Sequence, residues 1–279
     1  MVPAADPTPT TRFASDTAVV AFTDEPGGWT AMIDRGWWIQ RGPNGGYVAA
    51  ILARAVEATV GDRDRSLRSL TVHYLRPPVE GPVALRATVE RQGRSMTTVS
   101  VRMEQGDRVI ALALASCSAR RETVSWDDAP APAVAPPEDI PPPPGGPPIP
   151  LNERYEMRWA LGSPPFSGGG SAHSGGWIRL RAAESPEPDP DAVVRRALLV
   201  ALTDAWVPPI FSKVSVPLAV PTVDLTVHLR SPLPADYDDW FLVEFRSETS
   251  VDGFVEEDGR VWTRDGLLVA QSRQLAVVI

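Results

Sequence analysis

An aspartate within an apolar segment is the first residue whose type and setting suggest chemistry. The run from Ala197 to Trp206 is apolar except for Thr203 and Asp204. A carboxylate in such a run is either buried or lines a cleft, and near a helix C-terminus the macrodipole disfavours its charge by about 0.3–1 kcal/mol. Asp204 is therefore a candidate for function, and the alternative is a surface aspartate on a polar stripe.

A glutamine in the last segment is the second candidate. In a strand over residues 267–278, alternation places Gln274 on a face with small and apolar neighbours, whereas Gln271 and Arg273 lie on the other face. A buried amide must find hydrogen-bond partners. Gln274 therefore either helps to hold a reactant or makes a structural hydrogen bond to a strand edge.

Two glycines begin a helical segment in the first half of the chain. The stretch from Gln40 to Tyr47 reads QRGPNGGY, with Asn44, Gly45 and Gly46 directly before an apolar run. Free N–H groups at a helix N-terminus, aided by the helix dipole, can stabilise an oxyanion. These three residues are candidates for that role, and the alternative is an ordinary tight turn with Asn44 as the N-cap. The spacing does not match a dinucleotide-binding fingerprint.

Hydrophobic periodicity and turn residues predict the same order of elements in both halves of the chain. In the first half we expect a helix over residues 44–60 and strands over 17–22, 29–39, 67–75, 83–92, 96–104 and 108–118. In the second half we expect a helix over 191–206 and strands over 155–160, 176–181, 223–229, 240–249, 254–263 and 267–278. Each half therefore has two strands, one apolar helix and four further strands.

A proline-rich segment separates these halves. Half of residues 129–150 are proline, a density that no helix or sheet accommodates, so we expect an extended surface linker there. The predicted organisation is a disordered or extended N-terminus over 1–15, a first repeat over 16–128, the linker, and a second repeat over 151–279. The repeat is visible directly, because LTVHYLRP at 70–77 matches LTVHLRSP at 225–232 at five of eight positions.

The order of elements favours an α+β fold. A helix as apolar as either of the two expected here must be buried on most sides, and a curled antiparallel sheet wrapped around it achieves this. That arrangement is the hot-dog fold, and two tandem repeats predict a double hot-dog. A β-sandwich leaves no place for the helices, and a doubly wound fold requires alternating strands and helices.

Composition and charge exclude several classes of function. The net charge of -8 argues against a nucleic-acid-binding surface and against docking to an anionic membrane. No apolar stretch approaches 18 residues and the first residues do not resemble a signal peptide, so we expect a cytoplasmic protein that does not span a membrane. The single cysteine, Cys117, excludes an internal disulfide and is expected to be a small buried hydrophobe. Three scattered histidines give no reason to expect a metal.

Six stretches, in this order, resemble the type II acyl-CoA thioesterases. They are NGGYV at 44–48, VHYLRP at 72–77, RQGRSM at 91–96, LTD at 202–204, PTVD at 221–224 and DGLLVAQSRQ at 265–274. The resemblance implies a double hot-dog fold, hydrolysis of acyl-CoA, and no cofactor, since the CoA belongs to the substrate. By motif the catalytic Asp, Thr and Gln of that family fall on Asp204, Thr222 and Gln274, and its oxyanion turn falls on Gly45 and Gly46. Alternation places Thr222 on the more polar strand face, so its role rests on the resemblance.

The resemblance implies that Asp204, Thr222 and Gln274 hold a water that attacks the thioester carbonyl. Leu67 and Ala115 stand at the corresponding positions of the first half, so we expect one site per chain. Two other classes stay open: a non-hydrolytic protein that binds acyl-CoA or an acyl carrier, and a hot-dog enoyl-CoA hydratase, for which no suitable histidine is visible. Exposed sheet edges favour a homodimer or a higher homo-oligomer.

Overall fold

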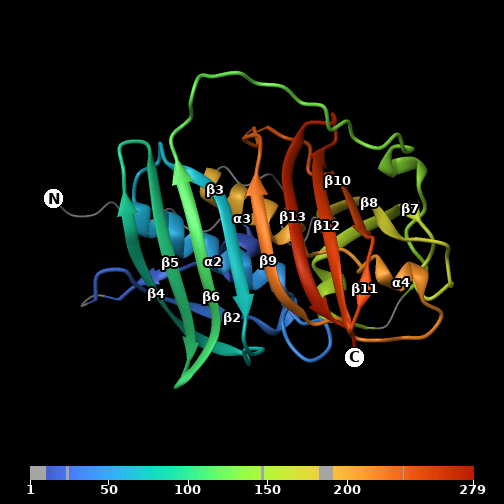
Figure 1. Cartoon of the computed structure of the whole chain (residues 1–279), viewed down its shortest axis with the longest axis horizontal. Helices are drawn as coiled ribbons and strands as arrows, with labels where there is room; N and C mark the ends of the chain where they lie inside the picture. The colour runs from blue at the N-terminus through green and yellow to red at the C-terminus, as the bar shows by residue number, and fades with distance from the viewer. Residues whose placement is uncertain (1–10, 23–24, 146–147, 182–190, 235) are drawn as a thin grey trace.

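A computed structural model describes residues 11–22, 25–145, 148–181, 191–234 and 236–279. In these ranges thirteen strands join into one antiparallel sheet, accompanied by a few helices (Figure 1). The helices are α1 Arg12–Asp16, α2 Gly45–Val60, α3 Ala192–Leu202 and α4 Ile210–Lys213, with short 3-10 turns η1 Arg35–Trp37, η2 Pro137–Asp139 and η3 Pro150–Glu153. The strands are β1 Val20–Ala21, β2 Gly28–Ile33, β3 Ser66–Tyr74, β4 Gly81–Gln92, β5 Met96–Gln105, β6 Arg108–Ser118, β7 Tyr155–Gly162, β8 Ala172–Leu180, β9 Thr222–Leu229, β10 Phe241–Ser247, β11 Ser250–Val251, β12 Phe254–Thr263 and β13 Leu268–Val277.

The sheet is arranged symmetrically about its central pair of strands. Its order is β1-β2-β4-β5-β6-β3-β9-β13-β12-β10-β8-β7, so the same sequence of elements runs outward from β3 and from β9. At the centre Thr71 pairs with Thr226, and their hydroxyl oxygens are 3.0 Å apart. These threonines occupy the same position in the two repeated octapeptides. Because equivalent residues face each other in an antiparallel pair, an approximate two-fold axis relates the two halves.

The first long helix agrees with the sequence, whereas the second is shorter than predicted. Helix α2 begins after the N-cap Asn44 and ends at Gly61, which has a left-handed φ of 61°. Helix α3 ends at Leu202 instead of continuing to residue 206. Thr203 and Asp204 instead donate their N–H groups to carbonyl oxygens three residues back, which tightens the chain into a turn. Asp204 therefore lies in the turn after the helix.

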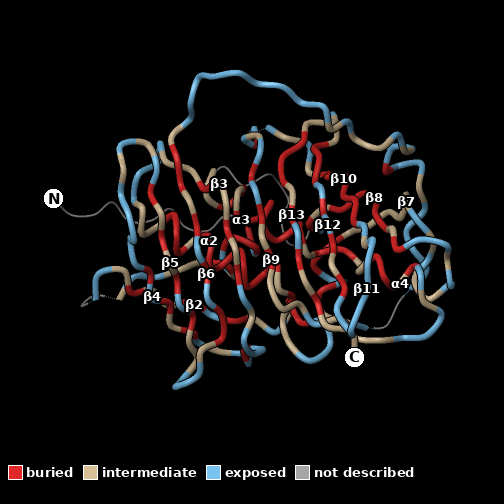
Figure 2. Tube along the Cα trace, in the orientation of Figure 1, coloured by how far each residue is buried: buried red, intermediate tan, exposed pale blue. Residues whose placement is uncertain are grey.

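The two helices pack side by side behind the central strands and form the core with them (Figures 1 and 2). The start of α2 lies at the end of α3, since a Cβ on Gly46 would be 2.4 Å from the Ala201 carbonyl oxygen. The end of α2 lies near the start of α3, where Glu57 pairs with Arg196 at 2.6 Å. The helices are therefore antiparallel, and the start of α2 lies against the end of α3.

The N-terminal segment contains a helix that we did not predict from the sequence. Residues 1–15 were expected to be disordered or extended, but Arg12–Asp16 form α1, and Phe13 is only 1% exposed. Thr11 caps the helix by accepting the Ala14 N–H at 3.1 Å. One buried aromatic residue and one N-cap hold this helix in place. A helix of five residues is too short for hydrophobic periodicity to reveal it. Residues 1–10 lie outside the described ranges.

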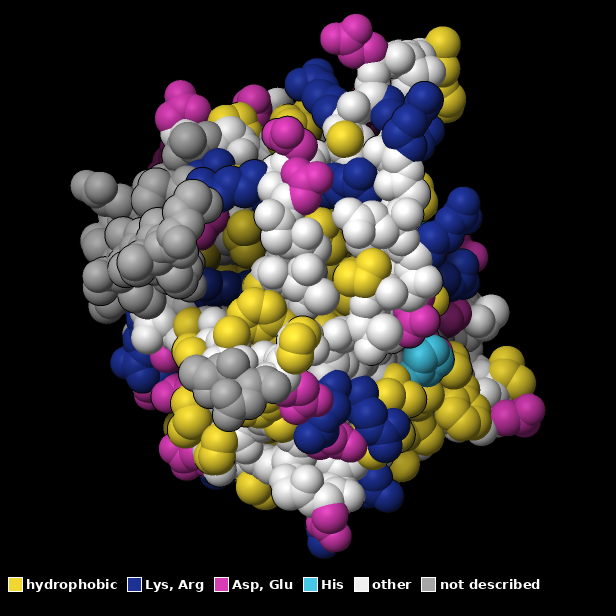
Figure 3. Space-filling model, turned by 90° about the vertical axis from the view of Figure 1, so that its left-hand side faces the viewer, with side chains coloured by type: hydrophobic (Ala, Val, Ile, Leu, Met, Phe, Trp, Pro, Cys, Tyr) yellow, Lys and Arg dark blue, Asp and Glu magenta, His cyan; other side chains and the backbone are white. Residues whose placement is uncertain are grey.

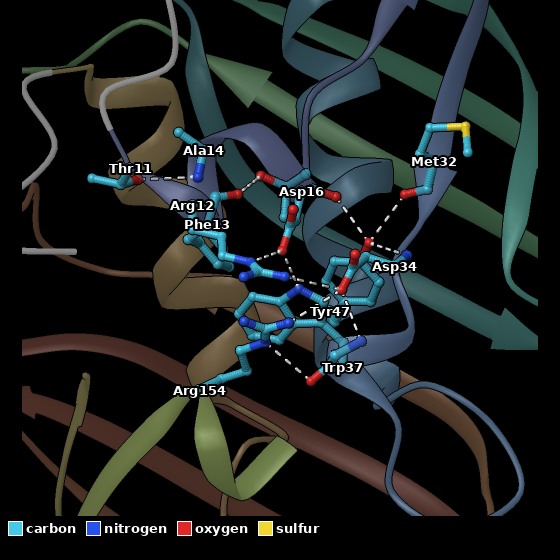
Figure 4. Close-up of polar contacts among 12 residues, drawn as sticks. Thr11, Arg12, Phe13, Ala14, Asp16, Met32, Asp34, Trp37, Tyr47 and Arg154 are labelled. Atoms are coloured by element: carbon cyan, nitrogen blue, oxygen red, sulfur yellow. Dashed lines mark hydrogen bonds and ion pairs between the residues drawn. The ribbon is translucent and has the colours of Figure 1, made fainter. Parts of the chain in front are cut away.

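A cluster around Trp37 joins α1 to both halves of the chain (Figure 4). The Trp37 ring stacks on Tyr47 of α2, with centroids 4.9 Å apart, and meets the edge of Phe13 at 5.6 Å. Its indole N–H donates to Asp16 Oδ2 at 2.9 Å. Arg154, from the second half, lies over the Trp37 ring with 5.6 Å between the guanidinium carbon and the centroid. Trp37 is thus a packing centre for three separate segments.

The proline-rich segment crosses the outer side of the second half, over the top of Figure 1. The indole N–H of Trp177 donates to the Ala135 carbonyl at 2.8 Å, and that of Trp262 donates to the Ala129 carbonyl at 3.0 Å. Val134 and Ile140 are partly buried against the same tryptophans. Residues 129–140 therefore cover an apolar patch of the sheet that would otherwise face water.

We expect Trp37→Ala to lower the free energy of unfolding by about 3–5 kcal/mol, because the Trp37 side chain is fully buried among aromatic rings. Trp126→Ala is the matched control, since Trp126 is 76% exposed and its loss should change stability by about 0.5 kcal/mol or less. Urea unfolding of the wild type and both variants measures the difference. Equal effects of the two substitutions would contradict the packing described for Trp37.

Candidate active site

Asp204 lies where the end of α3 meets the start of α2. Its Oδ2 accepts hydrogen bonds from the Gly46 N–H at 2.9 Å and from Asn44 Nδ2 at 2.9 Å. Asn44 Nδ2 also donates to the Asp204 carbonyl oxygen at 2.6 Å. These donors belong to the N-terminus of α2, so a carboxylate of the second half lies against the positive end of a first-half helix.

Two opposing effects set the acidity of this carboxyl group. Removal from water raises its pKa, whereas hydrogen bonds from Gly46, Gln274, Gly45 and Asn44 lower it, and the balance raises the pKa of Asp204 to about 6. At neutral pH the group is therefore mostly ionised. A carboxylate whose pKa lies near the working pH can accept a proton from a bound water.

The two glycines allow the helix to begin this close to Asp204. A Cβ on Gly45 would lie 3.0 Å from Asp204 Oδ2 and 3.3 Å from Tyr74 Oη, and a Cβ on Gly46 would lie 2.4 Å from the Ala201 carbonyl oxygen. Tyr74 Oη donates to the Gly45 carbonyl at 2.8 Å, which fixes the first residue of the helix. Any larger residue at these positions would push the helix N-terminus away from the carboxylate.

Asn44 holds Asp204 and caps α2 at the same time. Its Oδ1 accepts the Tyr47 N–H at 3.0 Å, as expected of an N-cap, and its Nδ2 is left to face Asp204. The alternative interpretation of Asn44 from the sequence, an N-cap, is thus confirmed, whereas its role toward a substrate stays a prediction. The Gly46 N–H, which we expected to face an oxyanion, donates to Asp204 in this structure. Its role toward a substrate stays a prediction.

Thr222 faces Gln274 because β9 is irregular at its start. Strands β9 and β13 pair Asp224 with Leu275 but Thr222 with Ala276, since a bulge takes up one residue of β9. The bulge turns Thr222 toward the face of Gln274, and Thr222 Oγ1 donates to Gln274 Oε1 at 3.0 Å. Alternation, which placed Thr222 on the same face as Asp224, was wrong for this reason.

Gln274 is buried on the inner face of β13, as its strand pattern predicted, and is 7% exposed. Its Nε2 donates to Glu257 Oε1 at 2.6 Å, and Gln274 is one of the groups that lower the pKa of Asp204. Removal from water raises the pKa of Glu257 to about 8, with a further contribution from the Asp204 charge. No sequence pattern pointed to Glu257, because only the pairing of β12 with β13 reveals that it lies opposite Gln274.

Two tyrosines near Asp204 were also missed. Burial raises the pKa of Tyr74 and of Tyr155, and the negative charge of Asp204 raises both further. Tyr155 Oη is buried and has no hydrogen-bond partner within the described ranges. Tyrosines in strands are ordinary core residues, so their position near a carboxylate becomes visible only in the folded chain.

The first half carries the same strand irregularity without the same side chains. Leu67 pairs with Cys117 as Thr222 pairs with Ala276, and a bulge follows Leu67. Leu67 is therefore the counterpart of Thr222, in agreement with the repeat in the sequence. Cys117 is fully buried, as predicted.

At the end of the helix pair away from Asp204, an ion pair joins α2 to α3. Glu57 of α2 lies 2.6 Å from Arg196 Nε and accepts the Leu67 N–H at 3.0 Å. Burial raises the pKa of Glu57, while the Arg196 charge lowers it. Glu57 is thus paired with a cation, whereas Asp204 has no ion pair among the described residues and lies against the start of α2.

Other parts of the described chain offer no competing site. No group of three or more His, Cys, Asp or Glu side chains in these ranges is placed to hold a metal ion, and none of the helices there is long and apolar enough to cross a membrane. Two surface hollows of about 370 and 540 Å³ are lined by residues other than those of the candidate site. On the face shown in Figure 3, charged side chains of both signs are interspersed with hydrophobic ones.

Comparison with protein families gives two matches that follow one another along the chain. The acyl-CoA thioesterase N-terminal domain matches residues 34–118, and the acyl-CoA thioesterase C-terminal domain matches residues 131–278. The chain belongs to the acyl-CoA thioesterase family. The resemblance found in the sequence is thereby confirmed. No curated protein sequence matches the chain at a significant level.

Solved structures agree with this family membership. A hot-dog-fold protein of unknown function from Alicyclobacillus acidocaldarius is 27% identical, covers 97% of this chain and 98% of its own, and has a TM-score of 0.85. A proposed thioesterase II from Thermobifida fusca is 27% identical over 98% of this chain and 99% of its own, with a TM-score of 0.82. The acyl-CoA thioesterase II TesB2 from Mycobacterium marinum, at 22% identity, covers 96% of this chain and 98% of its own and shares the fold with a TM-score of 0.76. This family member therefore has a hot-dog fold.

We expect Asn44→Asp to destabilise the protein as the pH rises, because it sets a second carboxylate beside Asp204. Two carboxyl groups that share a site cannot both ionise freely, so the pKa of one of them rises. A rise of about two pH units lowers the free energy of unfolding by about 3 kcal/mol once both groups are ionised. A raised pKa leaves stability intact at low pH and removes it as the pH passes the raised value. Thermal unfolding should therefore show a small loss at pH 5 and a larger one at pH 8.

Asn152→Asp is the matched control, because Asn152 is exposed and far along the chain from Asp204. Asp is also a good N-cap, so the capping bond to Tyr47 persists in the Asn44→Asp variant. A loss of stability that is equal at pH 5 and pH 8 would contradict the contact between Asn44 and Asp204.

Proposed function

We propose that this family member is an enzyme that hydrolyses acyl-CoA to a free fatty acid and CoA. The observation that carries the proposal is the Asp204 carboxylate, which has a pKa near 6 and faces the amide of Gln274 beside the hydroxyl of Thr222. Family membership supports this assignment. A base, a hydroxyl and an amide at one point provide the partners that an attacking water needs.

We further propose that the fold is a double hot-dog, in which each half of the sheet curls around one helix. The symmetric strand order and the facing threonines of β3 and β9 support this layout. The proposed site then lies between the repeats, because its carboxylate follows the second-half helix and its helix N-terminus belongs to the first. Only one end of the helix pair carries the required side chains, which supports one site per chain.

In the proposed mechanism Asp204, Thr222 and Gln274 orient a water molecule. The water oxygen attacks the thioester carbonyl carbon while Asp204 takes a proton from it. The tetrahedral intermediate then expels the sulfur of CoA, the carbon–sulfur bond breaks, and the proton held by Asp204 passes to the leaving thiolate. The products are a carboxylic acid and a free thiol. Holding water and ester in a reactive geometry supplies several kcal/mol of the rate acceleration.

The proposed partner of the developing oxyanion is the N-terminus of α2. The N–H groups of Gly45 and Gly46, with Asn44 and the helix dipole, form the positive end that faces Asp204. In the proposal, these donors, which bind Asp204 in this structure, also share the negative charge of a thioester carbonyl when one enters. The acyl-CoA itself, a homo-oligomeric state and a cytoplasmic location remain predictions from the sequence.

The positions of the histidines argue against an enoyl-CoA hydratase. His73 and His228 lie on the exposed side of β3 and β9, and His173 hydrogen-bonds Glu244 at 3.0 Å in the β8–β10 region. None of the three contacts Asp204. A hydratase would need an acid–base pair at the α and β carbons of its substrate, whereas hydrolysis needs a single base and a bound water.

We expect Asp204→Asn to lower kcat for thiol release from acyl-CoA by at least about 100-fold, since the variant keeps the shape of the side chain but cannot take a proton. The measurement is a free-thiol assay over acyl-CoAs of increasing chain length, with circular dichroism to establish the fold. Asp107→Asn, in the exposed turn between β5 and β6, is the matched control and should retain wild-type rates.

Three outcomes separate the alternatives. Wild-type thiol release that Asp204→Asn leaves unchanged would reject the assignment of the base. Tight binding of acyl-CoA without thiol release would favour the non-hydrolytic binding protein. Loss of enoyl absorbance from an enoyl-CoA without a free thiol would favour the hydratase.

A further inference from the structure

A second buried carboxyl group lies behind Gln274, on the strand next to it. Glu257 of β12 is directly opposite Gln274 in the β12–β13 ladder, and the two residues are 8% and 7% exposed. The neighbours Glu256 and Asp258 each lie 3.7 Å from Arg273, whereas Glu257 has no ion pair among the described residues. Burying a carboxyl group without a cation is costly. Stability alone therefore does not explain a glutamate here.

Glu257 contacts the Gln274 amide. Both the oxygen and the nitrogen of that amide form hydrogen bonds. Thr222 Oγ1 donates to Gln274 Oε1 at 3.0 Å, while Gln274 Nε2 donates to Glu257 Oε1 at 2.6 Å. Gln274 is also one of the groups that lower the pKa of Asp204. The nitrogen end of the amide thus binds Glu257, and the oxygen end binds the Thr222 hydroxyl.

The opposite orientation of the amide would be unfavourable because of Glu257. Half a turn about the last side-chain bond would set Gln274 Oε1 against Glu257 Oε1, the oxygen that now accepts from Nε2, and would leave Nε2 facing the Thr222 hydroxyl. With an apolar residue at position 257, one hydrogen of Nε2 would lose its partner in either orientation. The energy difference between the two orientations would then shrink, and part of the protein would hold Gln274 the wrong way round.

We propose that Glu257 is a positioning residue, which fixes the Gln274 amide so that Nε2 faces Asp204 and Oε1 faces Thr222. It acts through Gln274 and does not itself contact the attacking water. The proposal rests on the proposed thioesterase function, since it assigns Glu257 a part in orienting that water. It predicts that an acceptor oxygen at position 257 is needed for turnover, and that a negative charge there is not.

Two substitutions separate the acceptor from the charge. Glu257→Met keeps the length of the side chain and removes the acceptor, so kcat for thiol release should fall by about 10-fold or more while KM stays within about twofold. Glu257→Gln keeps a carbonyl oxygen that accepts the same hydrogen bond, so it should retain kcat within about threefold. Asp258→Asn, at the next position of β12, is the matched charge-removal control and should behave like the wild type.

A double-mutant cycle distinguishes positioning from a general loss of packing. In a Gln274→Ala background there is no amide left to orient, so Glu257→Met should cause no further loss of kcat. Thermal unfolding establishes that each variant is folded. If Glu257→Met does not fold, Glu257→Ala serves in the same cycle with the same expectations.

Each outcome of the experiment decides the proposal. Wild-type kcat in the apolar variant, an equal loss in Glu257→Met and Glu257→Gln, or an undiminished effect of Glu257→Met in the Gln274→Ala background would overturn the role of Glu257 alone. In those cases wild-type thiol release and its loss in Asp204→Asn would leave the thioesterase function standing. A wild type that releases no thiol from any acyl-CoA would overturn the function and, with it, this proposal.

Discussion

The contact between Asp204 and the start of α2 joins the two halves of the chain at a single charged group. A carboxylate in the turn after α3 receives the Gly46 N–H and the Asn44 amide, each at 2.9 Å. The contact requires antiparallel helices in which the start of α2 meets the end of α3, and the approximate two-fold arrangement of the sheet provides them. It also requires glycines, because a Cβ at either of the first two positions of α2 would crowd Asp204, Tyr74 or Ala201. The contact between Asp204 and α2 therefore depends both on the two-fold arrangement of the sheet and on the glycines at positions 45 and 46.

The polar groups beside Asp204 form a chain inside an otherwise apolar core. Two carboxyl groups, Asp204 and Glu257, are drawn out of water, and both have raised pKa values as a result. The Gln274 amide donates to Glu257 and accepts from the Thr222 hydroxyl, and it is one of the groups that lower the pKa of Asp204. At the other end of the helix pair Arg196 neutralises Glu57. Among the described residues, a cation therefore pairs with the carboxylate at the Glu57 end of the helix pair and none pairs with Asp204 at the other end. We propose that a base is needed at the Asp204 end.

Sequence patterns predicted most of this fold and part of the candidate site. The apolar runs and turn residues located α2 and the strands that follow it, because long periodic segments follow local patterns closely, whereas the strand expected over 29–39 ends at Ile33 and is followed by the 3-10 turn Arg35–Trp37. Local patterns failed where a few contacts decide the conformation: α1 depends on one buried phenylalanine, and α3 ends early because Thr203 and Asp204 bond three residues back. Alternation misplaced Thr222 because a bulge in β9 shifts the register. Glu257 escaped notice because cross-strand pairing between β12 and β13 brings it to Gln274.

The acidity of Asp204 in the wild type and in Asn44→Ala tests the central contact most directly. Carboxyl ¹³C NMR titration, with the Asp204 signal assigned from Asp204→Asn, reports this pKa without reference to any substrate. The account predicts a midpoint near 6 in the wild type and a higher one in Asn44→Ala, because the Asn44 hydrogen bond favours the ionised form. A wild-type midpoint near the ordinary 3.8, or a value that does not change when Asn44 is removed, would contradict it.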